Sequence, residues 1–263
     1  MTITATAIDG SEVKSTIELT VTSKVQEPYA VNFDKDATPS RTDRQLQSVK
    51  LTVNNKAESA QQITLNGNQC YYDLTEAPEG QLTCQTGDML KVALAHKGNW
   101  MNAAAFIDLS NDGKFSFNEG QTDQTGTDVM TFSFYSGNFN DDSKGVNSAG
   151  EELTGGNRNT MDCPEFTAPM QAGKYRIRFK YDWNSVDPGG QLAADGTPTG
   201  TNGILANGGA IVDAILEVTD AQTGIEGVTT ETNKNVIYDL SGRRLNETPA
   251  KGVYIKNNKK YVK

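Results

Sequence analysis

The sequence predicts an all-β protein: an antiparallel β-sandwich of the jelly-roll or Ig-like type, followed by a small C-terminal β module. Two observations predict this fold class. Apolar residues alternate with polar ones along most of the chain, which is the pattern of a half-buried strand. Gly, Asn and Asp interrupt these stretches at short intervals, and no segment has the length and apolar stripe of an amphipathic helix.

The first 27 residues predict a β-hairpin. Strands are expected at Ile3–Ala7 and Thr16–Val21, around Asp9-Gly10, a dipeptide that favours a type I′ turn. Because a lone hairpin is marginally stable in water, we interpret residues 1–27 as the remnant of a preceding Ig-like domain. Met1 leads straight into strand residues and not into a basic stretch with an apolar signal core, so no signal peptide is expected. Because the C-terminal residues described below indicate export, we interpret the chain as a fragment of a longer secreted protein.

The remaining chain predicts two units, a sandwich over residues 28–220 and a small β module over residues 221–263. Two Gly/Asn/Asp-rich stretches, Gly137–Thr160 and Asn184–Gly209, are expected to form long loops, which in compact domains are often functional. The strands of these units are expected at Gln47–Val53, Gln61–Leu65, Cys70–Asp73, Met89–Ala95, Ala103–Asp108, Asp128–Tyr135, Lys174–Tyr181, Ile211–Val218, Val236–Asp239, Gly252–Lys256 and Lys259–Val262.

Charge divides the chain into an acidic body and a basic end. The 263 residues include 24 Lys/Arg and 33 Asp/Glu, a formal net charge of −9. Residues 234–263 hold eight Lys/Arg and two Asp/Glu, a net charge of +6, which leaves 16 against 31 and a net charge of −15 for residues 1–233. The acidic balance argues against nucleic acid as a partner, because phosphate contacts rely on clustered Lys and Arg. No apolar run approaches the roughly 18 to 20 residues of a membrane helix, so no membrane span is expected.

The single histidine and three cysteines argue against most enzyme chemistry. His96 alone cannot supply the common zinc sites or the triads that use His without partners from unrelated loops. Cys70 and Cys84 flank a hairpin-like stretch, so they are candidates for a disulfide in an oxidising compartment. The alternative, which the lack of a CxxC pair favours, is that these two and Cys163 are buried thiols. We therefore predict no catalytic residues.

One motif carries chemistry. The segment Asp108–Glu119 has the spacing of a twelve-residue calcium loop, with oxygen-bearing side chains at positions 1, 3, 5, 9 and 12 and Gly113 at the sharp turn of position 6. A hard cation prefers six or more oxygen ligands, and this spacing brings several of them to one point. The predicted Ca²⁺ ligands are Asp108, Ser110, Asp112, the carbonyl of Lys114, and Glu119.

The flanks of this segment differ from those of the helix–loop–helix calcium hand. A buried strand is expected before it and a loop after it. The alternative is therefore a polar turn between strands, held by hydrogen bonds from side chains to the backbone. Ser110 stands at the third position in place of Asp or Asn and removes one charge, so a calcium site here is expected to bind in the micromolar-to-millimolar range of extracellular modules.

A longer pattern contains this motif and resembles the GEVED domain, a β-sandwich module of secreted bacterial proteins. The resemblance covers about Tyr29 to Thr219, and it implies a non-catalytic adhesion or accessory role. The residues that carry it are Phe106-Ile107-Asp108, Asn111-Asp112-Gly113-Lys114-Phe115, Glu119, Gly173-Lys174-Tyr175-Arg176-Ile177-Arg178 and Gly209-Ala210-Ile211-Val212-Asp213.

This chain departs from the family in the string that gives the family its name. Gly209 and Asp213 match that string, but Ala210 and Val212 stand where the family has glutamates. No role of those glutamates can be carried over. Asp213 matches the family residue, so the resemblance makes it a candidate extra metal ligand or loop anchor.

The last 30 residues show a second, independent resemblance. The strings Val236–Leu245 and Lys251–Ile255, followed by a lysine-rich end at Lys259–Lys263, resemble the C-terminal sorting domain of exported Bacteroidota proteins. Ser241-Gly242 is expected to form its hairpin turn, and Gly252 with Tyr254 to shape the return strand. The resemblance implies the type IX secretion machinery as a partner, and a protein that is secreted or held on the outer cell surface.

These features together predict a non-catalytic accessory module that binds a glycan or a surface protein. Trp100 and Trp183 lie at expected strand–loop junctions, where a flat ring can stack on a sugar, and Asp182 beside Trp183 is a further ligand-binding candidate. A tryptophan that packs into the sandwich core is the alternative for each ring. A structural spacer, adhesion or assembly module is the alternative for the whole chain.

An enzyme is the third possibility. Two carboxylates at a suitable separation can hydrolyse a glycosidic bond, but such pairs need rigid support and these acids lie in or beside Gly-rich stretches without a recognisable motif. The acids concerned are Asp141, Asp142, Glu151, Glu152, Asp182, Asp187 and Asp195.

Overall fold

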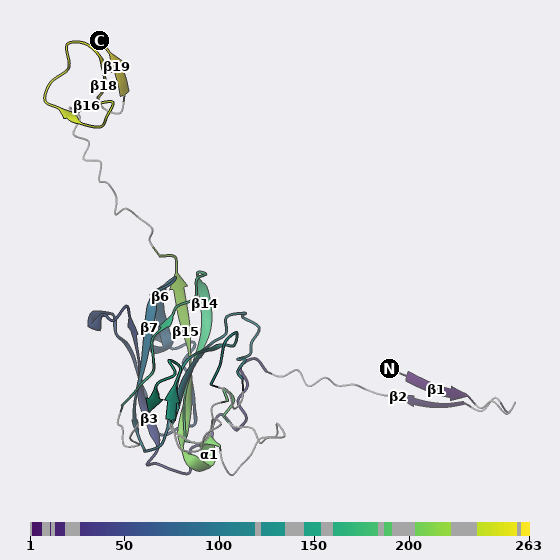
Figure 1. Ribbon diagram of the computed structural model, residues 1–263. Coiled ribbons are helices and arrows are strands. Elements are labelled where there is room, and N and C mark those ends of the chain that lie inside the picture. Colours follow the sequence, from purple (N-terminus) through teal and green to yellow (C-terminus); the bar gives the residue numbers. More distant parts are fainter. Residues whose placement is uncertain are drawn as a thin grey trace. The chain divides into compact units, whose positions relative to one another are not determined.

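The protein is all-β in the computed structural model (Figure 1), which describes residues 2–6, 11, 14–18, 27–118, 122–134, 145–153, 160–183, 187–190, 203–221, 236–256 and 259–263. The chain divides into two compact units, Met1–Ala221 and Gln222–Lys263. In the described part of the chain, the strands are accompanied by a four-residue helix, α1 (Ile204–Asn207), and by two short 3-10 turns, Ala57–Ser59 and Pro78–Gly80. Within the described residues, no helix is long and apolar enough to cross a membrane.

The larger sheet of the first unit has eight strands, and its three central strands are antiparallel and long. Two short strands pair in parallel with β15, which departs from the purely antiparallel sandwich that the sequence predicts. In order across the sheet, the strands are β11 (Glu152–Leu153), β10 (Gly145–Asn147), β9 (Val129–Phe134), β8 (Asn102–Ile107), β14 (Gly173–Asp182) and β15 (Gly209–Thr219), with β5 (Tyr71–Asp73) and β6 (Gln81–Gln85) beside β15.

The smaller sheet has five strands and is antiparallel. Its centre is the long pair β3 and β7, which share a register of eight residue pairs with one irregularity between Leu46 and Ser48. Its strands are β12 (Thr160–Asp162), β7 (Met89–Lys97), β3 (Gln45–Val53) and β4 (Gln61–Thr64), with β13 (Phe166–Thr167) also paired to β7.

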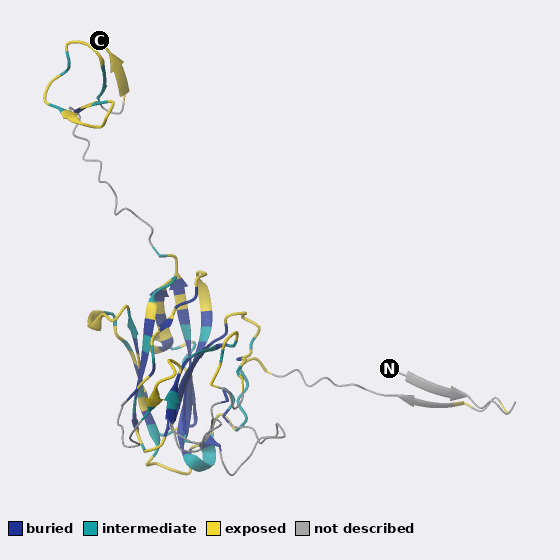
Figure 2. Ribbon diagram, in the orientation of Figure 1, coloured by how far each residue is buried: buried dark blue, intermediate teal, exposed yellow. Residues whose placement is uncertain are grey.

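A single large apolar core lies between the two sheets and confirms the predicted sandwich. Alternate residues of each strand point into it, because successive side chains of a strand face opposite sides of the sheet. Figure 2 shows the buried residues concentrated on the strands of this unit. The core includes Val49 and Leu51 of β3, Leu90, Val92 and Leu94 of β7, Ile177, Phe179 and Tyr181 of β14, and Val212, Ala214 and Leu216 of β15.

The outer face of the larger sheet is also buried, which sets up the candidate site. A second apolar cluster there contains Phe106 of β8, Phe132 and Phe134 of β9, and Phe115 from the segment that follows β8. Arg178 lies on this face, opposite Asp213 on one neighbouring strand and Phe106 on the other. Charged residues of the central strands are therefore buried under the loops that cover this face.

The strand predictions differ from the structure mainly in short strands. The predicted long loop Gly137–Thr160 contains β10 and β11, and it ends at the first residue of β12. Strands β6, β13 and β17 were also not predicted. Strands of two or three residues leave no recognisable alternation in the sequence, which explains most of these misses.

The N-terminal hairpin is formed by β1 (Thr2–Thr6) and β2 (Lys14–Glu18), which pair with one another as a two-stranded sheet. The predicted turn at Asp9-Gly10 lies outside the described residues.

The C-terminal unit is a four-stranded sheet with little core. Its strand order is β17 (Arg244–Leu245), β16 (Ile237–Asp239), β18 (Val253–Lys256), β19 (Lys259–Val262). The predicted hairpin turn is present: Gly242 has a φ of 82°, and the Asp239 carboxylate accepts hydrogen bonds from the backbone N–H groups of Ser241 and Arg243 at 3.0 Å. Ile237 is buried, whereas all four residues of β19 are exposed.

Candidate functional site

Asp108 is the centre of the candidate metal loop. It follows β8 directly, and its side chain is fully buried. Its Oδ2 atom accepts hydrogen bonds from the Tyr29 hydroxyl and the Gly113 N–H, both at 2.9 Å. Its Oδ1 atom accepts weaker ones from the Ser110 hydroxyl at 3.2 Å and the Asp112 N–H at 3.3 Å. One carboxylate therefore organises the whole turn.

These hydrogen bonds keep Asp108 ionised. Burial acts to raise the pKa of Asp108, but the hydrogen bonds from Gly113, Tyr29, Asp112 and Ser110 outweigh it and hold the pKa below its ordinary value. The reciprocal effect appears on the tyrosine, where burial and the neighbouring carboxylate raise the pKa of Tyr29 to about 12. Within the part of the chain that the structure describes, Asp108 forms no ion pair with Lys, Arg or His.

The turn itself has the conformation that its residue types favour. Asn111 and Gly113 adopt positive φ angles of 55° and 82°, and the Asp112 carboxylate accepts a hydrogen bond from the Lys114 N–H at 3.0 Å. Gly113 is also in close contact with the preceding segment, because a Cβ at this position would lie 3.1 Å from Pro28. The hydrogen bonds between side chains and backbone that define the alternative, a polar turn between strands, are thus present.

A second carboxylate, Asp128, holds the far end of the loop and is not among the predicted site residues. It accepts hydrogen bonds from the N–H and hydroxyl of Ser116 at 2.7 and 2.6 Å, and from the N–H of Leu109 at 3.2 Å. Asp128 directly precedes β9, so the pairing of β9 with β8 brings it to the loop. Its place just before an apolar alternating stretch gives no signal for this role.

The residues of the loop fit a hard cation in their chemistry but do not form a complete ligand cluster. The Asp108 Oδ1 and Ser110 Oγ atoms are 3.2 Å apart, a separation compatible with both oxygens binding one ion at roughly 2.3 to 2.6 Å. Asp112 and the Lys114 carbonyl belong to the same turn, whereas Glu119 lies outside the described residues. No group of three or more His, Cys, Asp or Glu that could hold a metal occurs among the residues described.

Asp213 was a candidate metal ligand, but it belongs to a buried ion-pair cluster with Arg176 and Arg178 and not to the Asp108 loop. Its carboxylate is fully buried and binds Arg178 through two hydrogen bonds, from Nε at 2.6 Å and from a terminal nitrogen at 2.7 Å. Arg176 donates to the same carboxylate at 2.8 Å and the Tyr71 hydroxyl at 2.9 Å. A metal ion would have to displace two guanidinium groups from it. Burial with the neighbouring Asp213 charge raises the pKa of Tyr71.

Arg178 converts this ion pair into an anchor for the loops. Beyond its two bonds to Asp213, its remaining three N–H groups donate to the carbonyls of Tyr29 at 2.7 Å, Pro188 at 2.9 Å and Ala30 at 3.4 Å. All five guanidinium donors are therefore used. The guanidinium carbon also lies 4.8 Å from the centre of the Phe115 ring. Asp213 thus acts on the loops through Arg178.

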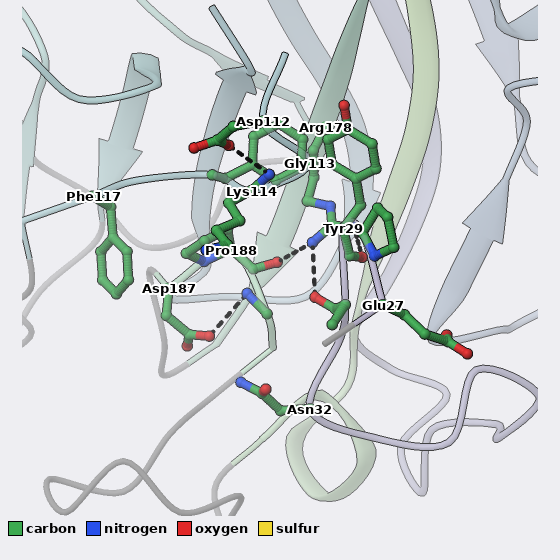
Figure 3. Close-up of a pocket in the computed structure, with 14 residues that line it drawn as sticks. Glu27, Tyr29, Asn32, Asp112, Gly113, Lys114, Phe117, Arg178, Asp187 and Pro188 are labelled. Carbon is green, nitrogen blue, oxygen red and sulfur yellow. Dashed lines mark hydrogen bonds between the residues drawn. The ribbon is translucent and has the colours of Figure 1, made fainter. Parts of the chain in front are cut away.

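A pocket of about 260 Å³ opens above this anchor (Figure 3). Its walls come from three segments that are distant in sequence: residues 27–32, residues 112–117 and residues 187–189. Backbone hydrogen bonds tie the segments together, from Tyr29 N–H to the Gly113 carbonyl at 2.7 Å and from Asn32 N–H to the Gly189 carbonyl at 2.6 Å. The predicted metal loop is therefore one wall of the pocket.

The third wall is fixed by a buried charge cluster. The Lys180 ammonium lies 3.2 Å from Asp182 Oδ2 and 3.7 Å from Asp187 Oδ1, and all three side chains are buried. Asp187 also accepts a hydrogen bond from the Gly189 N–H at 3.0 Å. Asp182 was predicted to bind ligand, but its side chain is 1% exposed and belongs to this cluster, so it is not accessible to a ligand.

The other acids of the hydrolase alternative are not assembled into an accessible pair by the described structure. Glu151 closes the turn between β10 and β11, where it accepts a hydrogen bond from the Asn147 side chain at 2.8 Å, and Glu152 is exposed on β11. Asp141, Asp142 and Asp195 lie outside the described residues.

The two tryptophans differ in how much of each ring is available. Trp100 is 53% exposed and adopts a positive φ of 60°. Trp183 packs against the sandwich core, and the Arg44 guanidinium lies 4.4 Å from its ring centre. That face of Trp183 is thus occupied, so Trp100 is the more exposed of the two predicted platforms.

The histidine and the cysteines are parts of the interior. His96 is buried, and its Nδ1 atom lies 2.7 Å from the Tyr181 hydroxyl. Cys70, Cys84 and Cys163 are buried thiols, and burial raises the pKa of Cys70 and of Cys84 to about 12. These two thiols are consequently poor nucleophiles at neutral pH.

Comparison with known proteins identifies no family for this chain. No family model matches the sequence, and no curated protein matches it. Among solved structures, the chain is similar to the CARDB domain of a Pyrococcus furiosus protein that was crystallised in complex with di-metal ions, at 11% identity and a TM-score of 0.26. That similarity covers 72% of this chain and all of the other. At this TM-score no site can be transferred, so the geometry above stands by itself.

Proposed function

We propose that this chain is a non-catalytic accessory module of a secreted or cell-surface bacterial protein, stabilised by Ca²⁺ bound at the Asp108 loop. The observation that carries the proposal is the environment of Asp108. It is a buried, ionised carboxylate whose described partners are all neutral donors. A buried charge without a counter-charge is costly, and a cation bound by the adjacent oxygens would reduce that cost.

The Ca²⁺ ligands in this proposal are Asp108, Ser110, Asp112 and the Lys114 carbonyl, with Glu119 completing the set. The ion itself would supply positive charge and fix the turn. Asp108 also accepts hydrogen bonds from the Gly113 N–H within the loop and from the Tyr29 hydroxyl, and the second bond joins the loop to residues 27–32. Calcium would therefore stiffen a loop that forms one wall of the pocket.

A glycan is the proposed ligand class, with Trp100 as one stacking surface. Trp100 is 53% exposed, whereas Trp183 is half-buried against the sandwich core. The non-catalytic assignment is supported by the burial and ion pairing of Asp182 and Asp187. A structural spacer or assembly module is the second candidate, favoured by the many contacts that hold loops rigid around Arg178.

Export is proposed on the C-terminal unit. The order of its motifs, its basic charge and its Asp239–Arg243 turn are those expected of a sorting module that addresses the secretion machinery. Expression of the chain with and without residues 221–263 in an organism that has this machinery tests the assignment. Equal export of both forms would contradict it.

Thermal melting with added Ca²⁺ and with a chelator tests the calcium proposal, since a ligand that binds only the native state raises its stability. Chelation is expected to lower the melting temperature of the natural protein, and to lower that of Asp108→Ala by less. Asp162→Asn, which removes an exposed acid from β12, is the matched control and should respond like the natural protein. Equal melting with calcium and chelator would overturn the proposal.

A further inference from the structure

We propose that the pocket above Arg178 binds a neutral sugar ring; this deepens the binding function proposed above and rests on it. The proposal concerns a site other than the two tryptophans, since neither ring lines this pocket. In Figure 3, Phe117, Asp187, Asn32 and Glu27 are spread around the pocket, and Lys114 and Arg178 lie closer to its middle.

The floor of the pocket offers no available guanidinium donor to an anionic group. Arg178 is its only buried cation among the described lining residues, and all five of its N–H donors are already bound to Asp213 and to three carbonyls. The Phe115 ring beside it packs against Tyr29, with ring centres 5.3 Å apart. An anion that enters the pocket could accept a hydrogen bond from Arg178 only by displacing one of these partners.

The rim carries charges of both signs together with an amide. Asp112 and Glu27 are exposed carboxylates and Lys114 is an exposed ammonium, while Asn32 is half-buried and offers both a donor and an acceptor. An anionic ligand would face the carboxylates and a cationic ligand would face Lys114. A neutral polyhydroxylated ring avoids both repulsions and can use every one of these groups.

An aromatic wall and the small volume complete the match. Phe117 is half-buried at the side of the pocket, so part of its ring can contact the C–H face of a sugar. A volume of about 260 Å³ lies just below the roughly 300 to 1,000 Å³ typical of small-molecule sites. One ring of an oligosaccharide fits this size better than a longer or flatter ligand.

Two glycines let the walls of the pocket approach each other closely. A Cβ at Gly189 would lie 2.7 Å from the side-chain amide nitrogen of Asn32, and a Cβ at Gly113 would lie 3.1 Å from the Pro28 side chain. The three walls are therefore packed against each other at glycines. A preformed site loses less entropy on binding than one that must be ordered.

The test is binding of the full chain to an array of neutral gluco-, xylo-, manno- and galacto-oligosaccharides, with oligogalacturonate as the acidic probe and saturating Ca²⁺ throughout. The best neutral binder is then titrated by calorimetry against four variants. Phe117→Leu keeps apolar packing but removes the flat ring, and Asn32→Ala removes the amide. Trp100→Ala removes the stacking surface proposed above, and Met170→Ala, at an exposed residue that does not line this pocket, is the control. We expect the two pocket variants each to weaken binding about fivefold or more, and the control to weaken it less.

Three results would overturn the inference: no binding to any neutral probe, stronger binding of oligogalacturonate, or binding that Trp100→Ala abolishes while both pocket variants retain it. The melting experiment separates these failures from failure of the calcium proposal. Asn32 is not a predicted calcium ligand, so Asn32→Ala should keep the full calcium-dependent rise in melting temperature whatever its sugar affinity.

Discussion

Two buried carboxylates of the same domain are stabilised in opposite ways. Asp213 on β15 and Asp108 at the end of β8 are both fully buried. Asp213 faces two guanidinium groups and a tyrosine hydroxyl, so its charge is balanced within the fold. Asp108 receives hydrogen bonds from neutral groups alone among its described partners. The Asp213 charge is thus neutralised within the fold, whereas the Asp108 charge has no counter-charge among its described partners and could bind a cation.

The difference also assigns each residue its place around the pocket. Asp213 holds Arg178, which binds the backbone of residues 29–30 and 188 from below. Asp108 holds the turn that closes the pocket from the side, through Gly113 and Tyr29. Loss of the first should damage the fold, whereas loss of the second should chiefly remove a response to calcium.

The largest expected effect is that of Asp213→Asn. This change leaves the buried Arg178 beside a neutral group, whereas the partly exposed Arg176 keeps Asp73 as a partner. Removal of one partner from a buried ion pair typically costs about 3 to 5 kcal/mol. The loss should appear as a lower midpoint in denaturant unfolding with a similar slope. Glu217→Gln, on the same strand but in the exposed pair with Lys174, is the control and should cost less than about 1 kcal/mol.

A loss of stability for Asp213→Asn no greater than that of the control would show that the two arginines are solvated without the Asp213 charge. Asp213 would then not be the structural counter-charge that distinguishes it from Asp108. The double variant Arg178→Met with Asp213→Leu sharpens the same point, because an apolar replacement of a buried pair is often close to neutral. We expect it to be more stable than Asp213→Asn, and to lose the hydrogen bonds that hold residues 29–30.

The second effect is that of Asp108→Asn, measured without calcium. The amide cannot accept at all four donor positions, so one or more buried donors loses a partner, at about 1 to 3 kcal/mol. The distinguishing measurement is the gain in stability on adding Ca²⁺. Asp213→Asn should retain that gain and Asp108→Asn should lose it. Retention in both would place any calcium site away from Asp108.

The sandwich and the Asp108 turn could be predicted from the sequence, but the pairing of Arg178 with Asp213 could not. The period-two alternation predicts the sandwich, and the spacing from Asp108 to Gly113 predicts the turn. The pairing of Arg178 with Asp213 depends on which strands are neighbours and in what register, and neither is encoded locally. One signal was available: Arg176, Arg178 and Lys180 recur at every second position of a strand whose other face is apolar, which marks a charged face of β14.

The role of Asp128, the pocket and the difference between the two tryptophans also depend on the tertiary structure and could not be predicted. Asp128 reaches the loop only through the pairing of β8 with β9, and the pocket exists only because residues 27–32 and 187–189 fold over the same sheet face. The exposure of Trp100 and the partial burial of Trp183 against the core could not be told apart from sequence position, since both residues lie at strand ends. Side-chain burial depends on which loops cover a strand end.

The third effect is a pH dependence specific to Asp108. Its pKa is lower in the folded protein than the ordinary value near 3.9, so the folded state favours the charged form. The resulting stability is fully present above about pH 4 and is lost as the pH falls through the lowered pKa. The stability difference between the natural protein and Asp108→Asn should therefore shrink below about pH 4. A difference that stays constant down to pH 2 would contradict the ionised state.

The smallest effect is that of Gly113→Ala, which probes the contact between the turn and the preceding segment. A positive φ makes alanine unfavourable by roughly 1 kcal/mol. Gly126→Ala is the matched control, because Gly126 has a φ of 78° but no atom within 4 Å of the added Cβ, whereas Gly113 would meet Pro28 at 3.1 Å. Any extra loss for Gly113→Ala over Gly126→Ala in denaturant unfolding therefore reports the packing of Pro28 on the turn. Equal losses would mean that Pro28 moves away from the added methyl group at little cost. The Asp108 turn would then be joined to this segment by the contacts of Tyr29 and not by the packing of Pro28.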